Sequence, residues 1–232
     1  MNKDPVIIAL DFESAADADR LVASLGDSAG FYKVGMELYA AAGMDYVRRL
    51  IDRGKRVFLD MKYYDIGETV RRATAVAARS GASFLTIHAV GQVMRAALEG
   101  RGESPMKLLA VTVLTSFDQS DVRELGYDCA LADLVRQRVR LAVDSGMDGL
   151  VGSPLEARTI RAQAGPKAIL VTPGVRSRGA ATGDQKRVAT PAEAVRDGAD
   201  YVVIGRQVTR AGDPRAALEA IHAELQEAAQ PA

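Results

Sequence analysis

The residues best placed for chemistry are Asp60, Lys62 and Asp65, which form the pattern D-x-K-x-x-D-I directly after the apolar residues 57–59. An apolar run that ends in charge is typical of a buried strand that reaches a functional surface. Residues i and i+2 of a strand point to the same face, with Cα atoms roughly 6–7 Å apart. We therefore expect the Asp60 carboxylate and the Lys62 ammonium to lie side by side, either in a reactive site or as a salt bridge on a solvated rim.

Two earlier apolar runs also end in charged residues, Asp11 and Lys33. Together with Asp60 and Lys62, these residues alternate in sign. Two unit charges ~4 Å apart interact by ~4 kcal/mol at an effective dielectric constant of about 20. Alternating signs would keep all four groups ionised in a partly dry pocket, whereas like charges would repel or shift their pKa values.

Asp65 fits this charged cluster less well. It lies three residues beyond Lys62 and past the expected strand, so the cluster of its own chain could be out of its reach. The alternative is a local role, in which Asp65 caps or precedes the following helix, with Thr69 on the first turn of that helix.

A second group of residues is suited to binding an anion. Arg176 and Gln185 lie in a glycine-containing segment after the seventh apolar run, and Gly205 with Arg206 follows the eighth. Glycine lets a backbone N–H approach phosphate oxygens, and arginine can donate two hydrogen bonds to a phosphate. A lone arginine is usually a surface residue, but two on adjoining loops predict a phosphate clamp, over which residues 176–185 could close.

These residues must be positioned by eight short apolar runs that alternate with eight amphipathic stretches. The predicted strands are residues 6–10, 31–34, 57–60, 84–87, 108–114, 149–151, 168–171 and 201–204. The predicted helices are residues 15–25, 40–53, 68–80, 92–99, 131–145, 155–164, 192–197 and 215–227. This alternation predicts a parallel sheet, and the short apolar runs fit strands that are buried on both faces.

The predicted fold class is α/β, a (β/α)8 TIM barrel that forms a single catalytic domain over residues 1–232. The alternative is an open doubly wound sheet, whose dinucleotide-binding form would carry G-x-G-x-x-G after an early strand. The first apolar run is followed instead by D-F-E-S at residues 11–14. The longest segments without a regular pattern are residues 116–130 and 173–189, and loops of such length tend to be functional.

The composition argues against several classes of protein. Of the 232 residues, 30 are Lys or Arg and 30 are Asp or Glu, so the zero net charge predicts no broad surface for nucleic acid. The single cysteine, Cys129, excludes an intrachain disulfide, and the two histidines could form a metal cluster only with carboxylates. No apolar run approaches the ~20 residues that cross a bilayer and no signal peptide is recognisable, so we expect a cytoplasmic protein with no membrane partner.

Together these motifs resemble the orotidine 5′-phosphate decarboxylase family over nearly the whole chain. The resemblance rests on the order and spacing of A-L-D (9–11), K-V-G (33–35), L-D-M-K (59–62), D-I (65–66), V-T-V-L-T-S (111–116), T-P-G-V-R (172–176), G-D-Q (183–185) and V-I-G-R (203–206). It implies a homodimeric barrel that converts orotidine 5′-monophosphate (OMP) to UMP and CO2, the last step of de novo pyrimidine synthesis. It also implies that no metal ion or organic cofactor takes part.

The resemblance assigns roles in catalysis to four residues. Lys33, Asp60 and Lys62 would form one charged array with Asp65 of the partner subunit. Lys62 would deliver a proton to C6 of the pyrimidine as CO2 leaves, and Asp60 would lie near the substrate carboxylate. A contribution from the partner subunit would also explain why Asp65 lies beyond the reach of its own cluster.

The remaining roles that the resemblance implies concern binding. Asp11 and Lys33 would hold the ribose hydroxyls, helped by Thr69 of the partner subunit, and Thr115 and Ser116 would face the pyrimidine. The phosphate would be held by Arg176, Gln185, Gly205 and Arg206, of which Gln185 would also bridge toward the base.

The chain departs from the family at residues 64–69, where Y-D-I-G-E-T replaces the usual H-D-I-P-N-T. Asp65 and Thr69 keep their places. Loss of the proline would loosen the start of the third helix, and Glu68 adds a charge near the expected subunit contact.

Two other functions stay open. The superfamily also contains Mg2+-dependent 3-keto-L-gulonate 6-phosphate decarboxylases and hexulose-phosphate synthases, but these place an acid near the position of Lys33, and a lysine cannot ligate the ion. The second alternative is a catalytically silent module that binds nucleotide phosphates, against which the Asp60–Lys62 pair argues. His88, after the fourth run, could line the pocket or be a core histidine.

Overall fold

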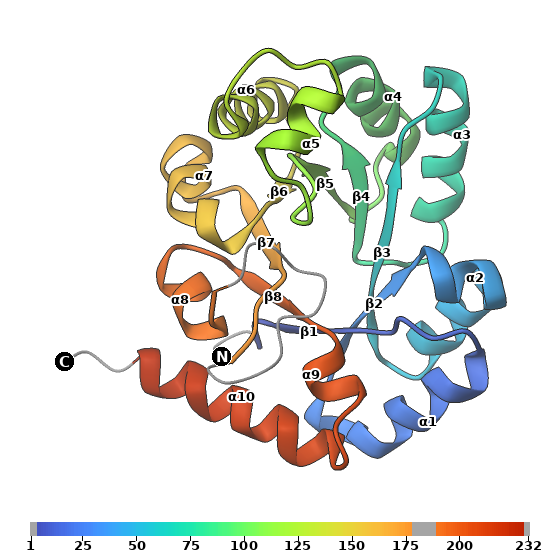
Figure 1. The fold of residues 1–232 in the computed structure, drawn as a ribbon. Helices are drawn as coiled ribbons and strands as arrows, with labels where there is room; N and C mark the ends of the chain where they lie inside the picture. The colour runs from blue at the N-terminus through green and yellow to red at the C-terminus, as the bar shows by residue number, and fades with distance from the viewer. Residues whose placement is uncertain (1–3, 178–188, 230–232) are drawn as a thin grey trace.

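The computed structural model describes residues 4–177 and 189–229, whose strands form a closed parallel barrel in chain order (Figure 1). The strands are β1 (Val6–Ala9), β2 (Phe31–Gly35), β3 (Arg56–Tyr63), β4 (Phe84–His88), β5 (Lys107–Val111), β6 (Gly149–Val151), β7 (Ile169–Pro173) and β8 (Tyr201–Ile204). β8 closes the barrel by pairing with β1, with Val202 opposite Val6 and Ile204 opposite Ile8. The predicted (β/α)8 TIM barrel is confirmed.

Helices surround the barrel (Figure 1). Those that were predicted are α1 (Ala15–Leu25), α2 (Met36–Asp52), α3 (Gly67–Ala78), α4 (Gly91–Arg101), α6 (Leu131–Asp144), α7 (Ala157–Ala164), α8 (Pro191–Arg196) and α10 (Pro214–Ala229). Four short elements were not predicted: helices α5 (Gln119–Glu124) and α9 (Arg206–Thr209), and 3-10 turns η1 (Gly26–Ser28) and η2 (Pro154–Glu156). No helix in the described part of the chain is long and apolar enough to cross a membrane.

The predicted end of the fifth strand is wrong. β5 ends at Val111 rather than at residue 114. The apolar run continues past this point, but the chain turns, and the Phe117 N–H donates to the Leu114 carbonyl at 2.9 Å. Thr115 therefore lies in this turn rather than directly at a strand end.

The predicted end of the third strand is also wrong. β3 continues to Tyr63 rather than stopping at residue 60, so Lys62 belongs to the strand. Its pairing with β4 changes register between Leu59 and Tyr63. An irregularity of this kind bends a strand locally and re-aims its side chains, which matters here because the charged motif occupies this stretch.

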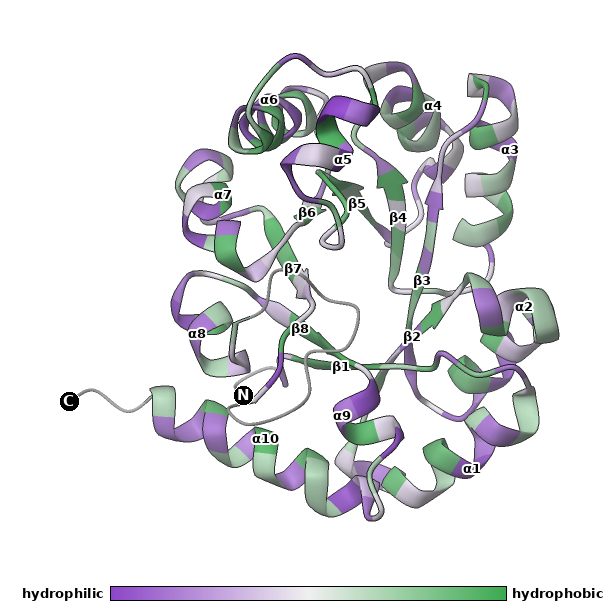
Figure 2. Ribbon diagram, in the orientation of Figure 1, coloured by the Kyte–Doolittle hydropathy of each residue, from purple (hydrophilic) through white to green (hydrophobic). Residues whose placement is uncertain are grey.

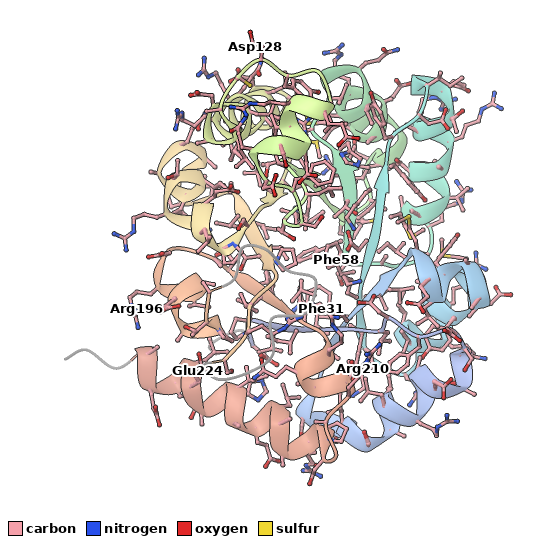
Figure 3. The ribbon with its side chains drawn as sticks, in the orientation of Figure 1. Phe31, Phe58, Asp128, Arg196, Arg210 and Glu224 are labelled. Carbon is pink, nitrogen blue, oxygen red and sulfur yellow. The ribbon has the colours of Figure 1, made fainter. Side chains whose placement is uncertain are left out.

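Alternate residues of the strands fill the interior of the barrel. This inner core comprises Ile7, Ala9, Phe31, Phe58, Phe84, Leu109, Val111, Val151, Val171, Tyr201 and Val203. A second core lies between the strands and the inner faces of the helices. Figure 2 shows that strands such as β4 and β8 are mainly hydrophobic, and Figure 3 shows Phe31 and Phe58 inside the barrel while Asp128 lies at the periphery.

A cation closes the end of the barrel at which the strands begin. The guanidinium carbon of Arg56 lies 3.9 Å from the ring centre of Phe31 and 5.5 Å from that of Tyr201, and Arg56 also donates to the Tyr201 hydroxyl at 3.1 Å. Burial lowers the pKa of Arg56, an effect that Asp4 opposes. Cation–π contacts of this kind stabilise a partly desolvated arginine, so this end is packed and the opposite end is left for chemistry.

Candidate active site

The inward-facing positions of β2 and β3 change from apolar to charged along the strands. Phe31 and Phe58 belong to the inner core, and two residues further along each strand come Lys33 and Asp60. Because residues i and i+2 share a face, the packing of the two rings directs the next side chains toward the barrel mouth. Lys33 is only 8% exposed.

Four charged side chains form a continuous line at this mouth. The Lys33 Nζ lies 2.8 Å from Asp11 Oδ1 and 3.8 Å from Asp60 Oδ2. Asp60 Oδ2 in turn accepts a hydrogen bond from Lys62 Nζ at 2.8 Å. The expected adjacency of Asp60 and Lys62 and the alternation of charge are both present, and a reactive site is favoured over a solvated rim because the Asp60 side chain is only 14% exposed.

The environment of Asp60 keeps its carboxylate ionised. Burial acts to raise its pKa, but the charges of Lys33 and Lys62 and hydrogen bonds from Lys62 and Thr86 outweigh burial and hold the pKa below its usual range. A carboxylate that is buried yet ionised presents a fixed negative charge to anything bound beside it. Such a group can orient an ammonium and repel another carboxylate.

Lys62 has an unusual backbone conformation. Its φ of 48° makes it the one residue other than glycine with a positive φ in the described part of the chain. This conformation is disfavoured for a side chain with a Cβ, by about 1–3 kcal/mol, and persists only where its surroundings enforce it. The positive φ of Lys62 coincides with the register shift between β3 and β4, so the backbone of Lys62 departs from that of a regular strand at the barrel mouth.

Thr86, a residue that the sequence did not single out, contacts both members of the motif. Its Oγ1 accepts a hydrogen bond from the Lys62 N–H at 2.8 Å and donates one to Asp60 Oδ1 at 3.0 Å. Thr86 is fully buried in β4. The sequence signal that could have identified Thr86 is its position between Phe84 and His88, on the inward face of β4.

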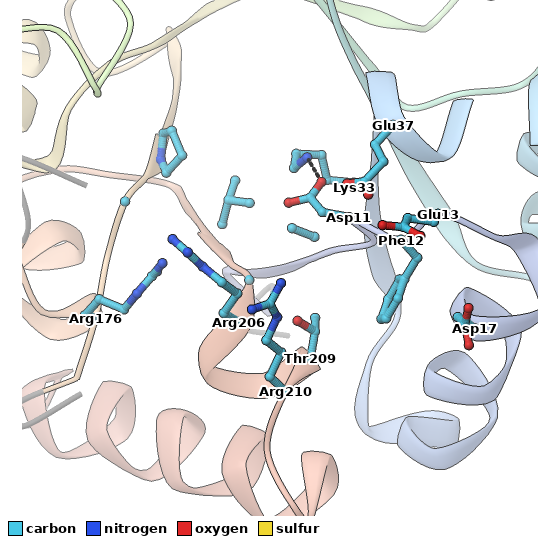
Figure 4. Close-up of a pocket in the computed structure, with 15 residues that line it drawn as sticks. Asp11, Phe12, Glu13, Asp17, Lys33, Glu37, Arg176, Arg206, Thr209 and Arg210 are labelled. Atoms are coloured by element: carbon cyan, nitrogen blue, oxygen red, sulfur yellow. Dashed lines mark hydrogen bonds and ion pairs between the residues drawn. The ribbon is translucent and has the colours of Figure 1, made fainter. Parts of the chain in front are cut away.

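A cavity of about 460 Å³ opens beside the charged line (Figure 4). Asp11 and Lys33 line one side, and Arg176, Gly205 and Arg206 line another. The structure therefore brings together residues in or just after the first two strands and residues that follow the last two, whereas Asp60 and Lys62 are not among the residues that line this cavity. One end of the cavity, near the array, is therefore lined by both acidic and basic side chains, and the opposite end is lined by cationic side chains.

The cationic end contains more arginine than the sequence indicated. Arg176 is only 9% exposed and donates to the Val175 carbonyl at 2.7 Å, and Arg206 is the first residue of α9. Arg210, which was not predicted, also lines the cavity, and Figure 4 shows its guanidinium group on the same side as those of Arg176 and Arg206. Gln185 lies outside the described residues.

The structure does not bring Asp65 and Thr69 to the array of their own chain. Both are exposed, and Thr69 lies on the first turn of α3 as expected. Asp65 Oδ1 accepts a hydrogen bond from the Ile66 N–H at 2.6 Å, and within residues 4–177 and 189–229 Asp65 forms no ion pair. The N-cap of α3 is Ile66, so Asp65 precedes this helix, as one alternative expected, but does not cap it.

The segment expected to face a pyrimidine lies away from the cationic cavity. Thr115 is half-buried and Ser116 is exposed, and neither lines that cavity. Near them a second cavity of about 370 Å³ is lined by His88, Tyr64 and mainly apolar residues of the loop after β5. The rings of Tyr64 and His88 meet edge to face, with centroids 5.6 Å apart.

His88 is half-buried and lines this second cavity. Burial lowers its pKa, and the charges of Arg138 and Lys62 act in the same direction. The imidazole is therefore neutral near pH 7 and is a pocket residue rather than a member of the charged array.

Glu68, the charge added at the departure from the family pattern, is held within its own helix. It accepts two hydrogen bonds from Arg71 at 2.8 Å and one from Arg72 at 2.6 Å. These bonds lower the pKa of Glu68 to about 2. In the described ranges, no group of three or more His, Cys, Asp or Glu side chains is arranged to hold a metal ion.

Comparisons with known proteins agree with this arrangement. A family model described as Orotidine 5′-phosphate decarboxylase / HUMPS family matches residues 4–221. An orotidine 5′-phosphate decarboxylase of Nitrobacter winogradskyi is 51% identical over 229 residues, which cover 99% of this chain and 95% of the relative. One from Rhodopseudomonas palustris is 51% identical over 227 residues, covering 98% of this chain and 97% of the relative.

A solved structure is also similar over the whole fold. The crystal structure of orotidine 5′-phosphate decarboxylase from Lactobacillus acidophilus matches with a TM-score of 0.84 at 36% sequence identity. The match covers 96% of this chain and 99% of that chain. The similarity therefore extends over nearly the whole barrel.

Proposed function

The chain belongs to the orotidine 5′-phosphate decarboxylase / HUMPS family and acts as a decarboxylase of OMP, and we propose that Lys62 delivers the proton in a reaction that needs no metal ion or organic cofactor. The products are UMP and CO2. The observation that carries the proposal is the line of alternating charges in which Lys33 and Lys62 flank the buried carboxylate of Asp60. The chain would form one catalytic domain over residues 1–232.

The chemistry requires a cation beside one carbon atom. When the C6–CO2 bond breaks, its electron pair stays on C6 in an orbital in the plane of the ring, where the ring cannot delocalise it. An ammonium fixed beside that carbon stabilises the developing charge with little reorganisation, and electrostatic stabilisation of this kind often contributes most to the rate enhancement of an enzyme. Lys62 then transfers one proton to C6 and regains it from water after product release.

Asp60 has two roles in this proposal. It holds the Lys62 ammonium at 2.8 Å, which fixes the proton donor before substrate arrives. Its negative charge would also lie near the substrate carboxylate, and repulsion between the two is relieved when CO2 leaves. Asp11 and Lys33 would bind the ribose hydroxyls from the neighbouring strand ends.

The cationic end of the cavity would hold the substrate phosphate. Arg176, Gly205 and Arg206 line this end, and Gln185 would join them. Charge-assisted hydrogen bonds to a phosphate far from the reacting carbon supply binding energy that orients the reacting end. Thr115 and Ser116 would face the pyrimidine.

We further propose that the enzyme is a homodimer in which Asp65 and Thr69 complete the array of the partner. Both residues are exposed and carry no contact to their own array, and they lie beside large exposed apolar residues. Tyr64 is 69% exposed and Ile66 is 71% exposed. A second copy of the chain would cover these side chains, which otherwise face water. A cytoplasmic location stays a prediction of the sequence.

The direct test is turnover of OMP by the purified protein, with and without EDTA. We expect UMP and CO2 to appear in equal amounts at a rate that EDTA does not change. Loss of activity in EDTA and its recovery with Mg2+ would contradict the metal-free proposal. Binding of UMP without any conversion of OMP would contradict the decarboxylase function itself.

A further inference from the structure

We propose that Thr86 is a positioning residue for the proton donor: its hydroxyl ties the backbone of Lys62 to the carboxylate of Asp60. This inference rests on the proposed function, since it concerns how the donor is held for that reaction. It adds a residue outside the charged array, because Thr86 is uncharged and completely buried behind Asp60 and Lys62.

The direction of both hydrogen bonds is fixed by chemistry. A backbone N–H can only donate, so the Lys62 N–H gives its proton to Thr86 Oγ1 at 2.8 Å. An ionised carboxylate can only accept, so the single hydroxyl proton of Thr86 goes to Asp60 Oδ1 at 3.0 Å. The hydroxyl therefore donates its one proton and accepts through one lone pair, and no other orientation of the O–H bond satisfies both neighbours.

These bonds close a ring with the Lys62 side chain. Asp60 accepts from Thr86 through Oδ1 and from Lys62 Nζ through Oδ2, at 3.0 and 2.8 Å. Lys62 is thus held at both ends, at its N–H by Thr86 and at its ammonium by Asp60. A carboxylate held through both oxygens cannot rotate freely, which restricts where the ammonium can lie.

The backbone of Lys62 is the part that needs this support. Lys62 has a φ of 48° and lies where the pairing of β3 with β4 shifts register, so regular strand hydrogen bonding does not hold it. Thr86 comes from β4, the strand across this irregularity, and is completely buried. A buried N–H without an acceptor is strongly disfavoured, so loss of the hydroxyl should let this backbone segment move.

The proposal predicts an effect on the chemical step rather than on binding. A shift of about 1 Å in a reacting group can lower a rate about 10²-fold, so a Thr86→Val variant should lose roughly 10- to 100-fold in kcat. Because Thr86 is completely buried and lies away from the arginines at the cationic end of the cavity, KM for OMP and the affinity for UMP should change little. A residue that merely filled space would not produce this separation.

The experiment uses two matched pairs that differ by the hydroxyl alone, Thr86 with Thr86→Val and Thr86→Ser with Thr86→Ala, assayed beside the wild-type enzyme. We expect Thr86→Ser to retain most of kcat and Thr86→Val and Thr86→Ala to lose it, with UMP affinity preserved in all. Wild-type kcat in Thr86→Val, or equal losses in Thr86→Ser and Thr86→Ala, would overturn the proposal. If Thr86→Val does not fold, the serine and alanine pair gives the same answer.

A second measurement separates this proposal from the proposed function. The amide proton of Lys62, followed by NMR, should exchange with solvent faster in Thr86→Ala than in Thr86→Ser, whether or not the protein turns over OMP. Unchanged exchange would show that the hydroxyl does not hold this backbone. The wild-type enzyme could fail to convert OMP while the Lys62 amide still exchanges faster in Thr86→Ala. That result would contradict the proposed decarboxylation but support the contact between Thr86 and the Lys62 backbone.

Discussion

At the scale of single residues, the proposed function gives different cations different tasks. In this proposal Lys62 must release a proton, which a lysine ammonium can do, whereas an arginine side chain stays protonated in proteins. The other end of the cavity carries Arg176 and Arg206, and a planar guanidinium can donate two parallel hydrogen bonds to a phosphate. The choice of lysine or arginine thus follows the chemistry expected at each end.

The phosphate role of Arg206 can be tested with paired substrates. Charge-assisted hydrogen bonds contribute about 1.5–3 kcal/mol, so Arg206→Ala should raise KM for OMP roughly 10- to 100-fold. Binding of the nucleoside orotidine, which lacks the phosphate, should be almost unaffected. Inhibition constants for UMP and uridine would provide the same comparison, and equal losses for the two ligands would refute the phosphate clamp.

The sequence predicted the charged residues of the site better than the neutral ones. Asp60 and Lys62 were found because a period of two after an apolar run places them on one face. Thr86 was missed because an uncharged residue within an apolar run is a weak sequence signal, and because its contact with Lys62 depends on a register shift between two strands. Arg210 was missed because it follows its strand only after the short helix α9.

At the scale of elements, β3 accounts for most of the difference between prediction and structure. An apolar run predicted where this strand begins, but its continuation through Lys62 depends on pairing with β4 beyond the irregularity. Helix α5 was missed because six residues are too few for a helical period, although Asp118 and Asp121 form a capping box at its start. The longer helices were predicted well because burial repeats along them.

The last helix has a pH-dependent contact with the start of the chain. His222 in α10 lies 3.3 Å from Asp4, and its contact with Asp4 raises the pKa of His222 above 6.5 despite burial, with Glu219 acting in the same direction. A pKa raised by folding means that the stabilisation is complete below the unfolded pKa and is lost as pH rises through the folded pKa.

We therefore expect His222→Gln to lower the free energy of unfolding more at pH 5.5 than at pH 8.5. The difference should be about 1 kcal/mol or less, since Asp4 is substantially exposed and solvent screens the pair. Urea unfolding at the two pH values measures it. Asp4→Asn is the matched control and should remove the same pH dependence; a His222→Gln effect that is equal at both pH values would contradict the assignment.

At the scale of the whole molecule, the proposed dimer would add Asp65 to an array that a single chain builds without it. One barrel assembles Asp11, Lys33, Asp60 and Lys62 at its mouth, but Asp65 lies exposed beyond the end of β3. From sequence, the family resemblance implied that Asp65 contributes to another chain, and the spacing of Asp65 alone left a local role open. Local patterns describe how a chain packs on itself, so the geometry between two copies is beyond their reach.

Shared active sites can be tested by mixing two inactive variants. Lys62→Ala lacks the donor, and Asp65→Ala lacks the carboxylate given to the partner, so each homodimer should be inactive. After subunit exchange, roughly a quarter of wild-type activity should return, because half the dimers are mixed and each mixed dimer has one intact site. No recovery, with mixed dimers demonstrated by mass spectrometry of the intact complex, would contradict a site built from two chains.

The proposed mechanism requires the Lys62 ammonium to stabilise and protonate the carbon that loses CO2. Its most direct test is the rate of CO2 release from bound OMP by Lys62→Ala, measured in single turnover together with the affinity for UMP. We predict a fall of at least about 10³-fold in the rate with the UMP affinity largely preserved, because the missing group acts mainly in the transition state. CO2 release at a rate close to that of the wild-type enzyme would contradict this role of Lys62.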